Sequence, residues 1–532
     1  MDQAAELPYT PASAAQRIPQ RIHNAYLPWV TDPATQQPCS RLALSDSHTA
    51  LTYGQLPEVV QSVAKCLKNA GVRGGDRVLL VAENSVALAV CILAVSQLDA
   101  WSVTVNSRLS SREINNFLQH SGARIAVYFS QSSAEALAHG EAHGAQTVQW
   151  HPAIGDLMLG PLNLHTEPEP LEDDAAEQVA VMVYTSGTTG SPKAVMLTHS
   201  NLLFIGNNSR QLRQLTAQDI VYGVLPLSHV YGLSALLVAS LMGGASLRLV
   251  PRFAVADLAQ ALASEGVTVL HGAPAMFAKL IETGKRPDVH LQAPQLRVVQ
   301  SGGAPLTLPL KQDFESMFGV VLQNGYGMTE AAPSICQTRL HAPRQDCSVG
   351  QAIPGIEVRL DGADTDPAGI GELWVRGPNV MKGYYRAPEL TAQTITPEGW
   401  LRSGDLARME DDGAIFIVGR SKELIIRSGF NVYPIEVEQV LNAYPGVVQS
   451  AVVGRDVAGN EEVIAFVEVG QGSEINTDDL KLYLKNALSP YKMPAQIIVL
   501  DHLPAAATGK ILKAELRQRA ASLAKPPPPV PS

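Results

Sequence analysis

The stretch YTSGTTGSPK (184–193) holds the residue types from which proteins build phosphate-binding loops. Consecutive small residues let backbone N–H groups point at an anion, hydroxyls add donors, and Lys193 supplies a mobile positive charge. The spacing differs from G-x-x-x-x-G-K-[ST], because Ser191 and Pro192 separate the last glycine from the lysine. Taken alone, the stretch is either a solvated linker or a loop that holds phosphate.

Two glycine-containing stretches further along the chain follow apolar runs that are typical of strands. In QNGYGMTEAAPS (323–334), the ring of Tyr326 suits stacking on a purine and the hydroxyl of Thr329 suits a phosphate. Glu330 offers a hard oxygen to Mg²⁺. The glycines of SGGAPL (301–306) permit close approach to a flat ligand. The alternative for both stretches is an ordinary tight turn, in the first of which Tyr326 would pack locally.

Two stretches nearer the C-terminus carry isolated charged residues. In WLRSGDLARMEDDGAIFIVGRSKELI (400–425), Asp405 can accept both hydroxyls of a ribose, and Arg420 can add a charge-assisted bond. The alternative is that Asp405 caps a turn and Arg420 is solvated. In LPAAATGKILKAELRQR (503–519), Lys510 is either a surface lysine or a functional one. A functional Lys510 requires movement of the whole small domain to reach a distant site.

Alternating apolar runs and helical patterns predict the elements that must position these residues. The strand-like runs are VLLVAE (78–83), RIAVYF (124–129), AVMVYT (180–185), TVLHGA (268–273) and LRVVQS (296–301). Near-continuous apolar strands separated by helices predict an α/β fold built on parallel sheets with both faces covered. After about Ile356, short strands bounded by Gly, Asp and Pro predict a small β-barrel-like subdomain.

The pattern becomes α+β after Arg420, which suggests a small, mobile C-terminal domain. We therefore expect an N-terminal domain at 1–420, a C-terminal domain at 421–525 and a proline-rich tail at 526–532. A chain of 532 residues is long enough for two or more domains.

Composition narrows the range of partners. The net charge of −10 argues against nucleic acid or an anionic membrane as the main partner. The five scattered cysteines include no C-x-x-C pair and are typical of reduced thiols. The N-terminus lacks a signal-peptide pattern, and apolar runs such as Val86–Leu98 are too short to span a bilayer. We expect a cytoplasmic protein without a transmembrane segment; the sequence does not indicate the oligomeric state.

Taken together, the motifs resemble those of the adenylate-forming superfamily of acyl- and aryl-CoA synthetases, nonribosomal adenylation domains and luciferases. The resemblance runs from about Leu51 to Lys513, with every motif in family order. The motifs are YTSGTTGSPKAVMLTHSNL, NGYGMTE, SGDLA, GRSKELI and the GK of TGKIL. The chain is most similar to 4-coumarate and fatty-acid CoA ligases.

The resemblance implies binding roles for most of these residues. Those implied to hold the β- and γ-phosphates of ATP are Thr185, Ser186, Gly187, Thr188, Thr189 and Lys193. Those implied to bound the adenine are Gly302, Gly303, Ala304, Asn324, Gly325 and Tyr326. Thr329 would contact the α-phosphate, and Glu330 would ligate Mg²⁺. Asp405 and Arg420 would hold the ribose.

The implied reaction has two halves. ATP and a carboxylic acid form an acyl-adenylate with release of pyrophosphate, and coenzyme A then releases AMP. Lys510 would bridge the carboxylate and the α-phosphate in the first half. The small domain would then rotate about Lys422 and bring Gly429 to the pantetheine tunnel.

The nature of the acid follows from two segments. His229 in VLPLSHVYGLSALL matches the family histidine that closes the carboxylate pocket, although a half-buried helical histidine is the alternative. No aspartate stands here to pair an α-amine. The segment Ala331–Ile335, which the family uses to line the pocket, is small and apolar apart from Ser334. An aryl or fatty monocarboxylic acid is therefore favoured over a diacid.

Two other functions remain possible from the sequence. One is an adenylating enzyme that loads a separate carrier protein, and the other is a non-catalytic nucleotide-binding protein on the same fold. The joint presence of Glu330, Asp405 and Lys510 weighs against the second.

Overall fold

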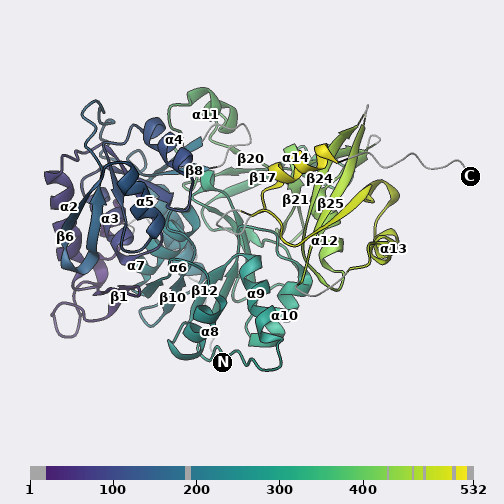
Figure 1. The fold of residues 1–532 in the computed structure, drawn as a ribbon, viewed down its shortest axis with the longest axis horizontal. Helices are drawn as coiled ribbons and strands as arrows, with labels where there is room; N and C mark the ends of the chain where they lie inside the picture. The colour runs from purple at the N-terminus through teal and green to yellow at the C-terminus, as the bar shows by residue number, and fades with distance from the viewer. Residues whose placement is uncertain are drawn as a thin grey trace, which may run out of the picture.

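The computed structural model describes residues 19–185, 193–427, 430–457, 460–470, 475–505 and 511–523. A large N-terminal part, purple to green in Figure 1, contains two β-sheets and their helices. A smaller yellow-green part follows at the C-terminus. The predicted α/β fold with a small C-terminal domain is confirmed.

The first sheet has parallel strands at its centre. Its strand order is β19-β9-β8-β4-β3-β5-β7-β6, and β8, β4, β3 and β5 run parallel. Its strands are β3 (Arg77–Ala82), β4 (Trp101–Asn106), β5 (Ile125–Tyr128), β6 (Gln146–His151), β7 (Gly155–Leu159), β8 (Val179–Thr185), β9 (Lys193–Thr198) and β19 (Gly383–Tyr384). Successive residues of β3 are buried in two different core clusters, so both faces of the sheet are covered.

The second sheet is also parallel except at its edges. Its strand order is β16-β15-β14-β13-β12-β10-β11-β1-β2, with β2, β15 and β16 antiparallel to their neighbours. Its strands are β1 (Leu42–Ser45), β2 (Ala50–Thr52), β10 (Ile220–Gly223), β11 (Ser246–Leu249), β12 (Val269–Gly272), β13 (Val298–Ser301), β14 (Leu322–Gly327), β15 (Ser334–Gln337) and β16 (Gln351–Ala352). The strands predicted from apolar runs therefore lie in these two sheets.

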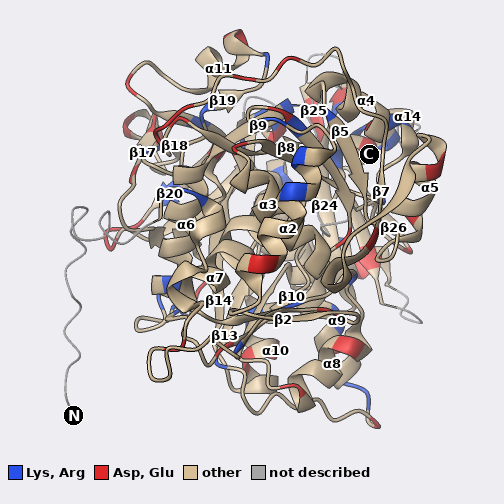
Figure 2. Cartoon of the chain, turned by 90° about the vertical axis from the view of Figure 1, so that its left-hand side faces the viewer, with Lys and Arg blue, Asp and Glu red and all other residues tan. Residues whose placement is uncertain are grey.

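Helices cover the sheets. They are α2 (Leu56–Asn69), α3 (Val86–Gln97), α4 (Ser111–Ser121), α5 (Ala134–Ala142), α6 (His199–Leu212), α7 (Ala239–Gly243), α8 (Val255–Ser264), α9 (Pro274–Gly284), α10 (Leu308–Phe318) and α11 (Pro388–Thr394). The uncharged α3 packs between α2 and the first sheet, and Figure 2 shows charged residues on α2 in front of it. A π-helical segment, η4 (Tyr231–Val238), packs on α6.

A four-stranded antiparallel sheet lies between the two large sheets and the C-terminal part (Figure 1). Its strands, in sheet order, are β17 (Glu357–Asp361), β18 (Gly371–Arg376), β20 (Leu401–Met409) and β21 (Ile415–Arg420). Side chains of β18 alternate between buried and half-buried, because one face packs on a core shared with Ala331 and Ile335. This packing places the sheet next to the segment that follows β14.

The C-terminal part has a sheet and a core of its own. Its elements are η7 (Ser421–Glu423), β22 (Ile425–Arg427), β23 (Phe430–Val432), α12 (Pro434–Asn442), β24 (Val447–Val457), β25 (Asn460–Val469), α13 (Thr477–Ala487), η8 (Pro490–Lys492), β26 (Gln496–Leu500) and α14 (Lys513–Ser522). Strands β24, β25 and β26 form its three-stranded sheet. Two hydrophobic clusters within this part contain none of the N-terminal residues.

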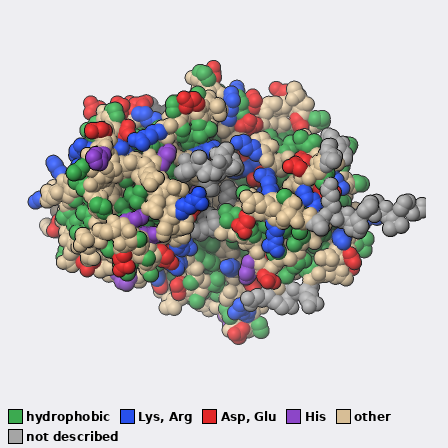
Figure 3. Space-filling model, turned by 45° about the horizontal axis from the view of Figure 1, so that its top comes forward, with side chains coloured by type: hydrophobic (Ala, Val, Ile, Leu, Met, Phe, Trp, Pro, Cys, Tyr) green, Lys and Arg blue, Asp and Glu red, His purple; other side chains and the backbone are tan. Residues whose placement is uncertain are grey.

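The surface and the helices bear on possible partners. On the face shown in Figure 3, basic and acidic side chains are interspersed. Within the described ranges, no helix has both the length and the apolar character needed to cross a bilayer.

Candidate active site

The predicted phosphate loop connects two antiparallel strands. Strand β8 ends at Thr185, β9 begins at Lys193, and these two residues are partners across the strand pair. The strands that flank the segment therefore form a β-hairpin, and α6 begins only at His199. This geometry differs from a Walker A loop, in which the glycine-rich segment leads directly into a helix. Thr185 and Lys193 are half-buried at the two ends of the loop.

Thr329 and Glu330 lie in the short helix η5 (Thr329–Ala331), directly after β14. Thr329 is buried and Glu330 half-buried. The backbone carbonyl of Glu330 accepts a hydrogen bond of 2.9 Å from the N–H of Met381. Its carboxylate Oε1 accepts one of 2.8 Å from the hydroxyl of Tyr384. Backbone and side chain of Glu330 are thus both held by the segment that contains β19.

Tyr384 connects Glu330 with the lysine of the phosphate loop. The Lys193 ammonium lies 5.5 Å from the centroid of the Tyr384 ring, within the range of a cation–π contact. Strand β19 pairs with β9, which brings the two residues together. Burial, and then the neighbouring Glu330 carboxylate, raise the pKa of Tyr384, so its hydroxyl remains a donor at neutral pH.

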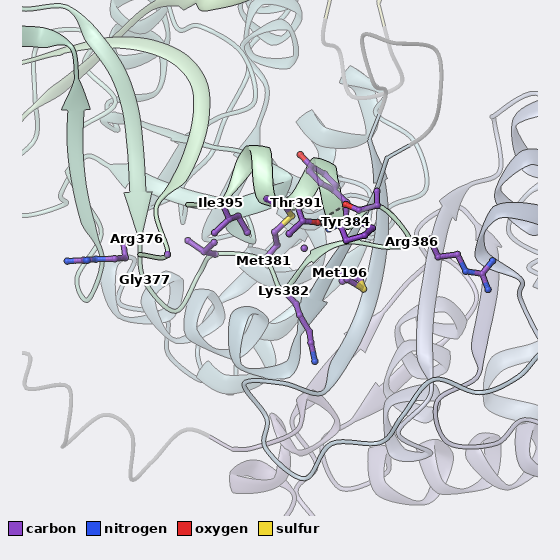
Figure 4. Close-up of a pocket in the computed structure, with 15 residues that line it drawn as sticks. Met196, Arg376, Gly377, Met381, Lys382, Tyr384, Arg386, Thr391 and Ile395 are labelled. Carbon is purple, nitrogen blue, oxygen red and sulfur yellow. Dashed lines mark hydrogen bonds between the residues drawn. The ribbon is translucent and has the colours of Figure 1, made fainter. Parts of the chain in front are cut away.

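A cavity of about 860 Å³ lies beside Tyr384 (Figure 4). Its walls include Met196, Met381 and Ile395. Arg376 and Lys382 also border it, but their side chains extend away from it and pair with Glu357 and Glu177. The cavity is therefore mainly apolar.

Tyr326, Asp405 and Arg420 form a second connected group. Asp405 in β20 lies opposite Arg420 in β21, and its Oδ1 forms an ion pair with the Arg420 Nε at 2.8 Å. Its other oxygen accepts a short hydrogen bond from the Tyr326 hydroxyl. Asp405 raises the pKa of Arg420, whereas burial and then Asp405 raise the pKa of Tyr326 well above its usual value. Tyr326 and Arg420 already orient the Asp405 carboxylate, and a ribose bound here would hydrogen-bond to that same carboxylate.

Of the two segments predicted to bound the adenine, Gly302–Ala304 follow β13 and Asn324–Tyr326 lie within the adjacent strand β14. Gly303 has a φ of +82° with open space where a side chain would point. A Cβ on Gly302 would lie 2.9 Å from the ring of Tyr231. Asn324 is buried, and its amide donates to two backbone carbonyls at 3.1 Å. Asn324 therefore shapes the loop, while Gly303 and Ala304 are accessible.

His229 precedes η4 and is half-buried. Its Nδ1 lies 3.3 Å from the backbone nitrogen of Tyr231. The segment predicted to line the acid pocket, Ala331–Ile335, is buried except for the half-buried Ser334. Ser234 of η4 donates a hydrogen bond of 2.6 Å to the carbonyl of Ala332, which places η4 against this segment.

Several predicted site residues lie outside the described part of the chain: Ser186, Gly187, Thr188, Thr189, Gly429 and Lys510. Among the other predicted residues, Lys193 and Glu330 are linked through Tyr384, and Tyr326 and Arg420 both contact Asp405. Tyr384 was missed from the sequence, although the run KGYYRAP offered an aromatic signal. Its contact with Glu330 spans 54 residues of sequence, which no local pattern reveals.

Comparisons with known proteins agree with this geometry. Residues 30–385 match the family described as AMP-binding enzyme, and residues 436–510 match the AMP-binding enzyme C-terminal domain. The chain is 35% identical to the feruloyl-CoA synthase of an Amycolatopsis species, over 90% of this chain and 95% of that protein. It is 32% identical to 4-coumarate-CoA ligase 1 of Narcissus pseudonarcissus, over 92% of each chain.

One solved structure resembles the fold closely. It is the o-succinylbenzoate-CoA synthetase of Bacillus subtilis in complex with ATP and a magnesium ion. The TM-score is 0.76 at 29% identity, covering 90% of this chain and 96% of that one.

Proposed function

We propose which residues carry the reaction and which acid is activated, given that the chain belongs to the AMP-binding enzyme family and is an ATP-dependent acid–CoA ligase. The enzyme joins a small carboxylic acid to coenzyme A through an acyl-adenylate. The observation that carries the residue assignment is the chain of contacts from Lys193 through Tyr384 to Glu330. Through Tyr384, these contacts link the ammonium of Lys193, to which we assign phosphate binding, with the carboxylate of Glu330.

The residues around Glu330 fit a magnesium ion. Mg²⁺ in nucleotide sites is usually held by one or two carboxylates together with phosphate oxygens and water. Glu330 supplies one such carboxylate, and no group of three or more metal-binding side chains occurs in the described ranges. Bound Mg²⁺ would offset the negative charge of ATP when the carboxylate approaches. Tyr384 orients the carboxylate, Lys193 grips the β- and γ-phosphates, and Thr329 contacts the α-phosphate.

The nucleoside would lie between the two connected groups. Gly302, Gly303 and Ala304, together with Asn324–Tyr326, bound the adenine, and Asp405 with Arg420 holds the ribose. The support is that Tyr326 hydrogen-bonds Asp405, so base-binding and sugar-binding residues are already joined. The described ends of the phosphate loop, Thr185 and Lys193, would grip pyrophosphate with Ser186, Gly187, Thr188 and Thr189.

The domain division proposed from the sequence, 1–420, 421–525 and 526–532, is supported by the separate cores of the two parts. Strand β21 ends at Arg420, and η7 follows with Lys422 at its centre. We propose that the C-terminal domain rotates here, delivering Lys510 for adenylation and Gly429 for thioester formation. The five free cysteines support a reducing compartment, and we propose the cytoplasm.

The acid is an aryl or fatty monocarboxylic acid. The buried, apolar segment Ala331–Ile335 supports this proposal, and so do the activities for which the aryl-CoA relatives are named. His229 would close the carboxylate end of the pocket. Loading of a carrier protein instead of coenzyme A has no specific support in the structure.

A panel of aryl and fatty acids tests this function. Each acid is incubated with Mg-ATP, and pyrophosphate, AMP and thioester are measured with and without coenzyme A. We expect thioester formation and AMP release to require both an acid and coenzyme A. If coenzyme A changed neither turnover nor product for any active acid, the ligase function would be wrong.

Tyr384→Phe tests the positioning of Glu330. The variant loses a hydrogen bond to a charged acceptor but keeps the ring beneath Lys193. We expect the Mg²⁺ concentration for half-maximal adenylation to rise about 10-fold. Tyr384→Leu also removes the cation–π contact and should cost about 3-fold more in adenylation rate.

The matched control for Tyr384→Phe is Tyr385→Phe. The Tyr385 hydroxyl donates to Glu169 at 2.6 Å, away from the predicted motifs. The control should leave the Mg²⁺ dependence unchanged. An equal shift in both variants would show that Tyr384 acts on stability and not on Glu330.

A further inference from the structure

A buried polar cluster interrupts the apolar core of the second sheet. It consists of Arg213, Tyr231, His271, Gln300 and Gln337, and its strand residues share one face of the sheet. His271 and Gln300 are partners in adjacent parallel strands and follow Val269 and Val298, which belong to the main core. The polar residues therefore replace apolar ones at the carboxyl ends of β12 and β13, where α/β sheets bind ligands.

Arg213 is the charged member of the cluster. It caps the C-terminus of α6 and is only 2% exposed. Its Nη2 donates to the Gln337 Oε1 at 3.3 Å, whereas Nε and Nη1 have no hydrogen-bond partner among the described residues. The dipole of α6 favours a cation here but supplies no acceptor to these two atoms. A buried cation without an anionic partner is strongly unfavourable, so this site is incomplete in the protein alone.

The neighbouring groups do not neutralise this charge. The Tyr231 hydroxyl lies 3.2 Å from the His271 Nδ1. Burial raises the pKa of Tyr231 to about 12, and burial followed by Arg213 lowers the pKa of His271 well below its usual value. Both residues are therefore neutral at physiological pH. The Oε1 of Gln300 is also buried without a partner among the described residues.

The cluster lies directly behind the proposed active site. Tyr231 packs against the backbone of Gly302, and the Gln300 amide lies 2.9 Å from the position of a Cβ on Gly325. Gln337 pairs with Gly325 across the sheet. The π-helical η4, which begins at Tyr231, also contacts the acid-lining segment through Ser234. π-Helical turns occur frequently at functional sites.

We propose that Arg213 recognises an acceptor oxygen at the end of the acid remote from the reacting carboxylate. The inference rests on the proposed function. A phenolic hydroxyl accepts from Arg213 and donates to the free Gln300 oxygen, and it leaves the acid monocarboxylic. A second carboxylate offers acceptors only. Arg213 lies outside the segment 331–335, in which the sequence showed no cation to pair such a group.

The test compares matched acids with and without the distal oxygen. The pairs are 4-hydroxycinnamate with cinnamate, and adipate with hexanoate, each measured as kcat/KM for thioester formation. The wild-type enzyme should prefer 4-hydroxycinnamate over cinnamate about 10-fold or more, and Arg213→Met should reduce that preference about 10-fold. Arg213→Lys should retain part of it. If the enzyme preferred adipate over hexanoate but did not distinguish 4-hydroxycinnamate from cinnamate, the acceptor oxygen that Arg213 recognises would come from a second carboxylate.

The control variant is Arg297→Met. Arg297 donates to the backbone carbonyl of Arg213 at 3.3 Å and pairs with Asp219, and its side chain is 36% exposed, whereas Arg213 is buried. It should leave the acid preference unchanged. If wild-type enzyme turned over both members of each pair equally, the inference would be wrong and the ligase function would stand. If no acid released pyrophosphate, the proposed function itself would fail.

Discussion

Replacing Glu330 with glutamine should lower the rate of adenylation about 1000-fold and leave the fold intact. The amide keeps the shape of the side chain and retains Oε1 as an acceptor for the Tyr384 hydroxyl, so only the negative charge is removed. Metal-ion stabilisation in such reactions amounts to several kcal/mol, and each 1.36 kcal/mol is a factor of ten in rate. The measurement is acid-dependent pyrophosphate release as a function of Mg²⁺ concentration.

Glu169→Gln is the matched control for this substitution. Glu169 also accepts a hydrogen bond from a buried tyrosine, Tyr385, but lies outside the nucleotide motifs. We expect its adenylation rate to stay within a few-fold of wild type. If Glu330→Gln kept most of its activity at every Mg²⁺ concentration, Glu330 would not be the metal ligand, and the contact with Tyr384 would serve the fold alone.

The sequence predicted the sheets well because their central strands are buried on both faces and are therefore continuously apolar. Strands β5, β12 and β13 lie within the apolar runs identified in the sequence, and β3 and β8 each begin one residue before theirs. In the structure, Glu330 lies directly after β14, whereas Asp405 lies in the middle of β20. The sequence did not reveal that the strands flanking the predicted phosphate loop form a hairpin, because the pairing of β8 with β9 depends on register and not on local pattern.

Two residues that we assign to the site could not be predicted from the sequence, for a similar reason. Tyr384 reaches Glu330 only because β19 pairs with β9 at the edge of the first sheet. Arg213 stands in the run RQLRQL, which is typical of a solvated helix end, yet it is folded inward over the second sheet. In both cases the tertiary pairing of distant strands, and not the residue type, decides what the side chain contacts.

Lys510→Ala should separate the two half-reactions. The proposed role of Lys510 is to place a cation between the acid's carboxylate and the α-phosphate during adenylation only. Loss of one such electrostatic group typically lowers the rate about 100- to 1000-fold. Thioester formation from preformed acyl-adenylate and coenzyme A should change less than about 5-fold, since the rotated domain presents a different surface. Single-turnover assays of each half-reaction give the two rates.

Lys513→Ala is the control that makes this result specific. Lys513 lies three residues further on and pairs with Glu438 at 2.8 Å and Glu423 at 3.1 Å, within the C-terminal part. Burial alone would lower the pKa of Lys513, but the two carboxylates raise it, so the lysine stays charged. Its loss should lower the free energy of unfolding by about 1–3 kcal/mol and affect both half-reactions alike. If Lys510→Ala also slowed both half-reactions equally, Lys510 would act in the same conformation in both of them. The proposed domain rotation would then be wrong.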